Sequence, residues 1–424
     1  MYDAARAFGP RVERAYTDPR SQVRIDDART FFSTGQRQYD AIVSEPSNPW
    51  VSGVANLFTV EFYRFLKHHL KEEGVLVQWL HTYELNDPLV ATMLAALVSE
   101  FPDTEFYAIT NGDLLILAPK GRFTTPFQDA PWREAALAAE LRRVGLGHLD
   151  EIALRRIGSG EVIRQYARLF AVQPHSEYYP EVSLNAPRTR FQKQRATFLY
   201  DLVTNGLPVL DILDCRIPSG AKAQVINSAH SFSKQRFLAL QVIDAIRQGR
   251  TSAEFKRNLP QDAQNIGHAL SVMQRASSGT PELTREWSAN LSMLAEASVG
   301  ALPAEDLLDI WQSAPDWLPA NVLRTPLAAA LMRTYAATAA RDPQAMLREA
   351  EAVLSMSDAG NLAPATREYL LVIAMLGALG SGDPQKAADL NLRHTNNIAN
   401  RFTSVRSYLL AWADSGVPAC VARR

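Results

Sequence analysis

Apolar and polar positions in the first third of the chain alternate between short apolar runs and stretches with helical spacing. Apolar runs over Tyr39–Ser44 and Gly74–Trp79 predict two strands, and helical spacing over Val60–Lys71 and Pro88–Phe101 predicts two helices. The pair Asn111-Gly112, between two further strand-like runs, is a hairpin signal. This alternation predicts an α/β fold with a mostly parallel sheet and an antiparallel edge.

The pattern begins late for a complete domain of this kind. Met1–Phe8 is typical of a helix, Val23–Ile25 of a short strand, and Ala28–Ser33 of a second helix. A nucleotide-binding α/β domain also needs a first strand with a glycine-rich turn and a second strand ending in an acidic residue. Neither precedes Val23, so we expect a Rossmann-like sheet without its first strands and a sequence that is a fragment of a longer protein.

Three regions follow from the pattern along the chain. Residues 1–125 are predicted to form the partial α/β domain, and residues 126–285 a mixed, mainly helical connection. Within this connection, residues 175–190 form an irregular segment with two prolines and clustered aromatic residues, which is either a candidate lid or a domain-joining loop. Residues 286–424 are predicted to be helical throughout.

The helical region contains the triplet Asp-Pro-Gln twice, at 342–344 and 383–385. Each triplet places an N-capping Asp before a Pro in the first helical turn. Two copies favour tetratricopeptide-like repeats and an irregular helical bundle equally.

Composition narrows the function less than the pattern does. A net charge of −1 gives no field to attract nucleic acid, and an apolar share of 47% is typical of a globular protein. Two cysteines, Cys215 and Cys420, favour unremarkable thiols in a reducing compartment. The longest apolar run, Tyr369–Leu379, is too short to cross a bilayer, and no signal peptide is visible, so we expect a cytoplasmic location. No cluster with metal-ligand spacing is found, and no metal is expected.

The segment Tyr39–Tyr63, YDAIVSEPSNPWVSGVANLFTVEFY, carries the candidate chemistry. Glu45 ends the predicted strand, where open α/β sheets bind their ligands. The segment resembles the spermidine synthase (polyamine aminopropyltransferase) family, whose pattern here is a strand, D-S-S-D-P, a loop and L-F-x-x-x-F-Y. The similarity is good over residues 20–85 and looser to about residue 120.

The resemblance implies a role for each residue of the motif. Glu45 takes the place of the first Asp, the base that must remove a proton before an amine becomes nucleophilic. Its extra methylene moves the carboxylate by roughly 1.5 Å, and Asn48 replaces the second acid. Ser47 matches the motif and shapes the loop, whereas Trp50 replaces a smaller residue and would narrow the amine channel or stack on a ligand. Each has a structural alternative, such as a strand-end carboxylate for Glu45.

Two other positions are implied by the same resemblance. Gln78 lies near a family glutamine that lines the amine site, and His81 and Tyr83 follow at the same strand end. Asp27 and Ala28 match the Asp-Ala pair that contacts the adenine of the donor. For Asp27 the alternative is a helix N-cap without any ligand.

Three functions remain open from the sequence. The first is aminopropyl transfer to an amine from a decarboxylated S-adenosylmethionine-type co-substrate, with no tightly bound cofactor. The second is a methyltransferase that uses S-adenosylmethionine. The third is an inactive α/β platform whose C-terminal helices bind a protein. We also expect a homo-oligomer, and the resemblance implies a bacterial fusion with membrane-spanning N-terminal segments.

Overall fold

The structure is a computed structural model that describes residues 2–51, 53–123, 128–216, 231–249, 261–277, 280–312 and 317–423. Its strands are β1 (Tyr39–Ser44), β2 (Leu70–His81), β3 (Glu105–Ala108), β4 (Asp113–Pro119) and β5 (Arg156–Ser159). The α-helices among the described residues are α1 (Tyr2–Arg6), α2 (Arg14–Thr17), α3 (Ala28–Ser33), α4 (Val60–His68), α5 (Asp87–Glu100), α6 (Ala130–Arg133), α7 (Ala135–Arg143), α8 (Leu149–Leu154), α9 (Gly160–Leu169), α10 (Glu181–Phe191), α11 (Phe198–Thr204), α12 (Val209–Leu213), α13 (Ser231–Arg247), α14 (Gln261–Gln274), α15 (Pro281–Ser298), α16 (Ala320–Leu323), α17 (Pro326–Ala340), α18 (Pro343–Leu354), α19 (Pro364–Gly380), α20 (Pro384–His394) and α21 (Thr403–Ser415). Short 3-10 helices include η2 (Val54–Phe58) and η6 (Cys420–Arg423).

The strands form one mixed sheet in the order β1-β2-β4-β3-β5. β1 and β2 are parallel, with Ser44 opposite Gln78, whereas the pairs β2–β4, β4–β3 and β3–β5 are antiparallel. The predicted α/β class with a helical C-terminal region is confirmed. The expectation of a mostly parallel sheet is wrong among these strands, because the β3–β4 hairpin brings β4 back between β2 and β3.

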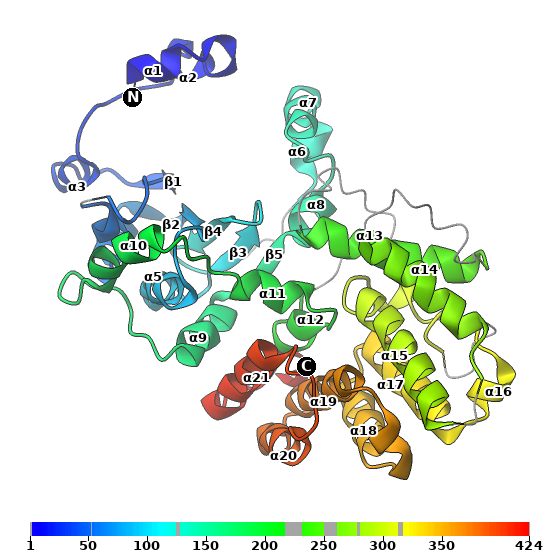
Figure 1. Cartoon of the computed structure of the whole chain (residues 1–424). Coiled ribbons are helices and arrows are strands. Elements are labelled where there is room, and N and C mark those ends of the chain that lie inside the picture. The colour runs from blue at the N-terminus through cyan, green and yellow to red at the C-terminus, as the bar shows by residue number, and fades with distance from the viewer. Residues whose placement is uncertain are drawn as a thin grey trace.

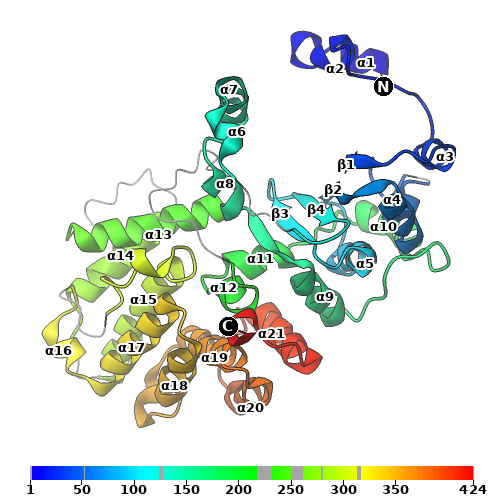
Figure 2. The ribbon, with the colours of Figure 1, turned by 180° about the vertical axis from the view of Figure 1, so that it is seen from behind.

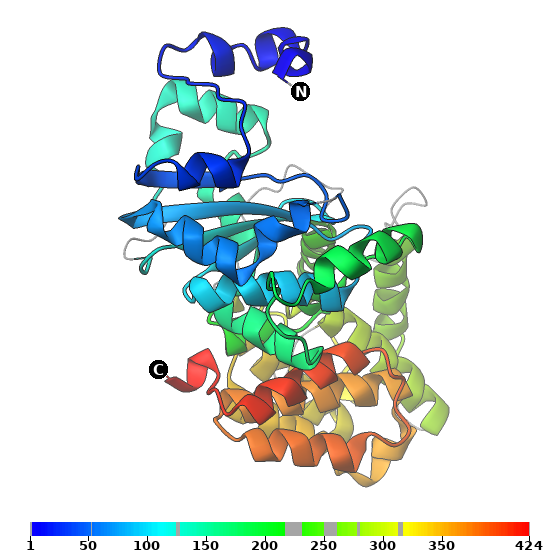
Figure 3. The same ribbon diagram turned by 90° about the vertical axis from the view of Figure 1, so that its left-hand side faces the viewer.

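The two faces of the sheet are covered to different extents. Side chains alternate along a strand, and on β2 the buried positions Leu76 and Leu80 share the hydrophobic core with Phe62 of α4 and Leu94 of α5. On the opposite face, Val43 of β1 is 73% exposed. Figure 3 shows the sheet edge-on, with the α3 and α6–α7 ribbons on one side and the C-terminal helices on the other. One face of the sheet is therefore more deeply buried than the other.

The N-terminal segment departs from the prediction at one point. Ala28–Ser33 forms α3 as expected, but Val23–Ile25 forms no strand, and Ile25 is 86% exposed. A strand needs a hydrogen-bonding partner, and none of the described strands lies beside these residues. Figures 1 and 2 show α1 and α2 standing apart from the sheet, joined to α3 by an extended segment.

The C-terminal region confirms the helices predicted from its sequence. The Asp342 side chain accepts a hydrogen bond from the Ala345 N–H at 3.1 Å, and Asp383 accepts one from the Lys386 N–H at 2.9 Å. Both aspartates are therefore the N-caps that the two Asp-Pro-Gln triplets predicted. The helices α17 to α20 each pack against the next one in the chain.

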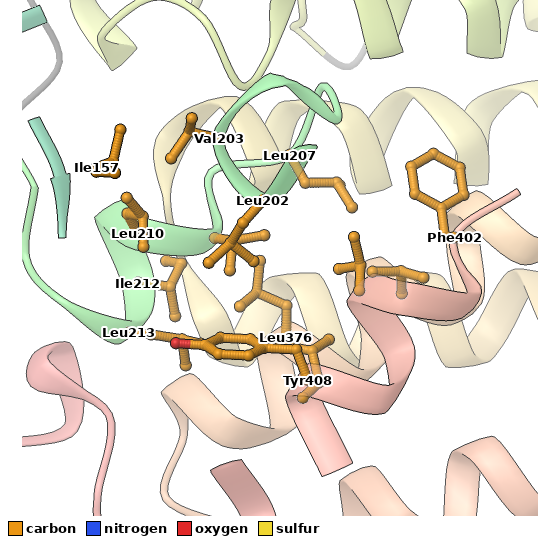
Figure 4. Close-up of a cluster of buried hydrophobic side chains, with 14 of the residues drawn as sticks. Ile157, Leu202, Val203, Leu207, Leu210, Ile212, Leu213, Leu376, Phe402 and Tyr408 are labelled. Carbon is orange, nitrogen blue, oxygen red and sulfur yellow. The ribbon is translucent and has the colours of Figure 1, made fainter. Parts of the chain in front are cut away.

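The helical region is joined to the α/β part through a shared core. The Tyr408 hydroxyl of α21 donates to the Val162 carbonyl of α9 at 3.2 Å. Asp214, at the end of α12, accepts a hydrogen bond from the Ser159 N–H of β5 at 3.1 Å and pairs with Arg156 at 2.8 Å. Figure 4 shows the apolar side chains that meet at this junction, among them Ile157, Leu202, Leu210, Leu376 and Tyr408.

The two cysteines form a disulfide rather than free thiols. Cys215 and Cys420 are 205 residues apart in sequence, and the fold brings their Cα atoms to 5.5 Å. The prediction of two unremarkable thiols is therefore wrong, because a contact over that separation depends on the tertiary fold and leaves no local pattern. The bond fastens η6 to the end of α12. Among the described residues, no helix has the length and apolar character needed to cross a membrane.

Candidate active site

The carboxyl ends of β1 and β2 meet at one edge of the sheet, as parallel strands require. Ser44, the last residue of β1, lies opposite Gln78, whose side-chain Nε2 donates to the Ser44 carbonyl at 3.3 Å and to the Trp79 carbonyl at 2.8 Å. Gln78 is fully buried, and its Oε1 has no hydrogen-bond partner among the described residues. A buried acceptor without a partner costs free energy.

Glu45 follows Ser44 directly and leaves the sheet at this edge. Its side chain is exposed, and within the described ranges no hydrogen bond or ion pair engages its carboxylate. Both interpretations of Glu45, a base and a structural strand-end carboxylate, place it here, and its role stays a prediction. A carboxylate in this position can accept a proton from a group bound beside it.

The loop after Glu45 folds back onto β2. The Val51 N–H donates to the Asn48 carbonyl at 2.9 Å, and the turn leaves Asn48 and Trp50 half-buried and Ser47 exposed. The Trp50 ring meets the His81 ring edge to face, with centroids 5.0 Å apart. Asn48 and Trp50 are thus held at the same edge as Glu45.

The two residues predicted to contact adenine have different surroundings in the structure. Asp27 is the N-cap of α3, and its Oδ1 accepts a hydrogen bond from the Thr30 N–H at 2.9 Å, which lowers the pKa of the carboxyl group. Ala28 lines a cavity of about 670 Å³ between α3 and β1, together with Asp26 and Val43. Asp27 therefore has the capping role that the sequence offered as its alternative, while Ala28 lies where a ligand could reach it.

The candidate lid contacts several elements of the site. Residues 175–190 were predicted to be irregular, and this prediction is wrong from Glu181 onward, where α10 begins. Pro187 lies inside this helix, and a proline is usually a signal against a helix. Before α10, Glu177 pairs with Arg29 of α3, and the Glu177 N–H donates to Glu61 of α4 at 3.1 Å. The candidate lid is thus bonded to α3, which borders the cavity, and to α4, which follows the loop after Glu45.

An aromatic cluster continues from Trp50 along the end of β2. The rings of His81 and Tyr83 stack with centroids 4.4 Å apart, and Trp79 lies 5.3 Å from His81. Burial lowers the pKa of His81 to about 4, an effect that Asp113 partly opposes. His81 is therefore neutral near pH 7, and its buried Nε2 has no partner among the described side chains.

Sequence reasoning missed the contact between Trp50 and α10. The guanidinium carbon of Arg190 lies 5.0 Å from the centroid of the Trp50 ring, and Arg190 also pairs with Glu84 at 3.6 Å. Arg190 is 140 positions away from Trp50, so no local signal connects them. Among the described residues, no group of three or more His, Cys, Asp or Glu side chains is placed to hold a metal ion.

Comparison with known proteins identifies the relatives of the N-terminal part. Residues 1–111 match the family model for the spermine/spermidine synthase domain. The polyamine aminopropyltransferase of Nitrosomonas europaea is 34% identical over 102 residues, which cover 24% of this chain and 31% of that protein. The polyamine aminopropyltransferase of Bacillus subtilis is 29% identical over 107 residues, which cover 25% of this chain and 38% of that protein.

This chain spans about a third of the length of these curated relatives. A solved structure, a probable spermidine synthase from Corynebacterium glutamicum, aligns over 39% of this chain and 59% of its own at 18% identity, but its TM-score of 0.27 carries no argument. The sequence matches confirm the resemblance that the Glu45 motif indicated. The N-terminal part of the chain is spermidine synthase-like, related to the polyamine aminopropyltransferases.

Proposed function

We propose that the spermidine synthase-like part of this protein transfers an aminopropyl group from a decarboxylated S-adenosylmethionine-type donor to an amine. The observation that carries the proposal is the position of Glu45. Its carboxylate is exposed at the carboxyl end of β1 and engaged by no hydrogen bond or ion pair among the described residues. The match to the spermine/spermidine synthase domain model, over residues 1–111, covers this same segment.

For this transfer the protein mainly has to place a base beside the acceptor nitrogen. The nitrogen lone pair of the acceptor attacks the first carbon of the aminopropyl chain, and the bond from that carbon to the sulfonium sulfur breaks. The sulfur leaves as a neutral thioether, so no acid is needed. Glu45 accepts the proton that the acceptor nitrogen must lose, and its negative charge favours the cationic amine beside it.

The other predicted residues have supporting roles in the proposal. Ala28 borders the cavity in which the adenosine of the donor would lie, beside the capped end of α3. Gln78 offers its unpaired Oε1 to an N–H group of the acceptor, and Asn48 and Trp50 border the acceptor. Ser47 shapes the loop. No tightly bound cofactor is part of this account, since the donor is a co-substrate.

Replacing Glu45 by Gln tests the proposal. The amide keeps the size of the side chain but accepts a proton poorly, so Glu45→Gln should lower turnover by at least about a hundredfold. Binding of methylthioadenosine should stay within a factor of about two, since Glu45 does not line the cavity that holds Ala28. Equal turnover of the two proteins would exclude Glu45 as the base.

Methyl transfer is the second candidate, and Asn48 is the residue that favours it. An amide in place of an acid leaves Glu45 as the single carboxylate of the motif, which is enough for a less cationic acceptor. The two functions share the adenosine region and differ in the donor. Mass analysis of the acceptor after incubation with each donor separates them.

The helical region leads to proposals about partners. Its exposed Leu392 on α20, 79% accessible, lies on a region that we propose binds a protein, with a homo-oligomer as one form of that contact. If the α/β part is an inactive platform for this contact, the protein will bind no methylthioadenosine. Sedimentation and methylthioadenosine titration of the same sample test both statements.

The compartment is also a proposal. The sequence indicates the cytoplasm, with membrane attachment of a longer parent protein. The Cys215–Cys420 bond argues instead for oxidising conditions, because disulfides are rare in reducing compartments. Alkylation of intact cells before reduction decides between them: two modified cysteines support the cytoplasm, and none supports an oxidising compartment.

A further inference from the structure

The open face of the Trp50 ring is the place where the acceptor side of the site meets α10. A cation attracted to an aromatic ring lies over its face within about 6 Å of the centroid. The Arg190 guanidinium occupies that place at 5.0 Å. The His81 ring also contacts Trp50, with centroids 5.0 Å apart and the two rings steeply inclined to each other. An incoming ammonium group would therefore find the face of Trp50 already occupied by a cation of the protein itself.

The charged groups around Trp50 are of both signs: Arg190 lies over the ring, Glu84 pairs with Arg190, and Asp113 acts on the neighbouring His81. The last turn of α10 carries Arg188 and Arg190, and both side chains are exposed. The nearby carboxylate Glu84 already pairs with Arg190 at 3.6 Å. Asn48, in the same turn as Trp50, is uncharged. Apart from Glu45, the motif loop thus presents no carboxylate to a second ammonium group.

A diamine acceptor has two ends with different needs. One nitrogen must become neutral beside Glu45 in order to react, while the other stays protonated and needs a carboxylate or an aromatic face. Here that far end would approach the Arg190 guanidinium, and like charges at this range repel. A carboxylate at the far end would instead accept hydrogen bonds from the guanidinium, whose planar fork matches a carboxylate.

We propose that Arg190, seated on Trp50, selects the acceptor by charge, and that the acceptor is an amine with a carboxylate at its far end rather than a polyamine. This inference rests on the proposed function and concerns the same site. Arg190 is a specificity-determining residue in this account, because its guanidinium would touch the acceptor. Glu84 holds the guanidinium in place when the acceptor is absent.

Three acceptors of matched length test the inference: 4-aminobutanoate, 1,4-diaminobutane and butylamine. They share one reacting amine and differ in the charge at the far end. The full chain and the variants Arg190→Gln and Arg190→Glu are compared with the control Arg188→Gln, which removes an equal charge two residues away on α10. Each is titrated with each acceptor in the presence of methylthioadenosine, and kcat/KM is measured with the decarboxylated donor.

We expect the protein to prefer 4-aminobutanoate over 1,4-diaminobutane by at least about tenfold in affinity and kcat/KM. Arg190→Gln should bring this ratio near one, Arg190→Glu should invert it, and Arg188→Gln should leave it within about twofold. If Arg190 has only a structural role, its replacement should lower the affinity and kcat/KM for all three acceptors equally, and this result would overturn the inference. Preference for the diamine, or no binding of any acceptor, overturns it as well.

The proposed function fails by a different result. If 4-aminobutanoate binds with the expected dependence on Arg190 but no acceptor gains an aminopropyl group, charge selection stands and aminopropyl transfer does not. If transfer occurs with the diamine preferred, the proposed function stands and the inference is wrong.

Discussion

The sheet edge that carries Glu45 and the helical region that follows it bury their side chains in opposite ways. In α19, every residue from Tyr369 to Gly380 is buried, whereas in β1 only Ile42 is. The ion pairs differ in the same sense. Glu368 of α19 is fully buried among its partners, while the Glu72 side chain, which pairs with Lys120 at the opposite, amino end of β2 in the same sheet, is 89% exposed.

The difference indicates that the most buried core and the candidate site lie in different parts of the chain. The helices α17 to α21 share a buried apolar core, and the edge with the candidate site is open to solvent on one side. Regions with few buried apolar contacts open locally at low free energy, and binding sites are commonly drawn from them.

The largest effect is expected at the buried carboxylate of α19. Glu368 accepts hydrogen bonds from the Arg401 N–H at 2.6 Å and the Phe402 N–H at 3.0 Å, and pairs with the buried Arg406 at 3.3 Å. Glu368→Ala leaves Arg406 without its charge partner and should cost about 3–5 kcal/mol in the free energy of unfolding. Urea denaturation measures it.

The matched control for that prediction is Glu72→Ala in β2. This variant removes an exposed ion pair, which is worth about 0–1 kcal/mol. Equal costs for Glu368→Ala and Glu72→Ala would contradict the contrast between the two regions.

A smaller effect is expected from removing apolar volume. Leu376 of α19 is fully buried at the junction shown in Figure 4, and Leu376→Ala should cost about 2–4 kcal/mol by leaving a cavity. Val43→Ala, on the open face of β1, should change the free energy of unfolding by no more than about 0.5 kcal/mol. A large loss in Val43→Ala would mean that the open face is covered in solution.

The smallest expected effect is a pH dependence of the free energy of unfolding, which arises from His81 at the sheet edge. Burial lowers the pKa of His81 to about 4, below the value of about 6.5 expected in the unfolded chain. Between these values the unfolded state binds more protons than the native state, so stability falls as the pH is lowered from 6.5 toward 4. The loss should reach roughly 1–2 kcal/mol near pH 5.

The variant His81→Phe isolates this effect, since Phe keeps an aromatic ring beside Trp50 and Tyr83 but does not titrate. The difference in unfolding free energy between the two proteins should therefore depend on pH below 6.5 and be constant above it. Parallel curves over the whole range would show that His81 does not titrate differently in the folded protein.

Local patterns predicted the elements, and tertiary contacts decided the rest. The strand Tyr39–Ser44 and the helix Ala28–Ser33 were predicted with their observed bounds, because each has a clear period and α3 has a capping Asp. Val23–Ile25 has the composition of a strand but no partner beside it. The order of the strands depended on where the hairpin returned, which residue spacing does not record.

For the candidate site, too, local positions could be predicted from the sequence, whereas long-range contacts could not. The motif placed Glu45, Asn48 and Trp50 at a strand end, and the structure confirms that they lie there. The contact of Arg190 with Trp50 and the Cys215–Cys420 bond each join distant segments, so only the folded chain reveals them. The roles of the site residues stay predictions.

Aminopropyl transfer by Glu45 is best tested by the mass of an amine acceptor after incubation with the full chain and decarboxylated S-adenosylmethionine, with Glu45→Gln in parallel. We expect that the acceptor gains one aminopropyl group, that methylthioadenosine is released in equal amount, and that Glu45→Gln forms at least about a hundredfold less product. No aminopropyl product from any acceptor, or equal product from the variant, would contradict it.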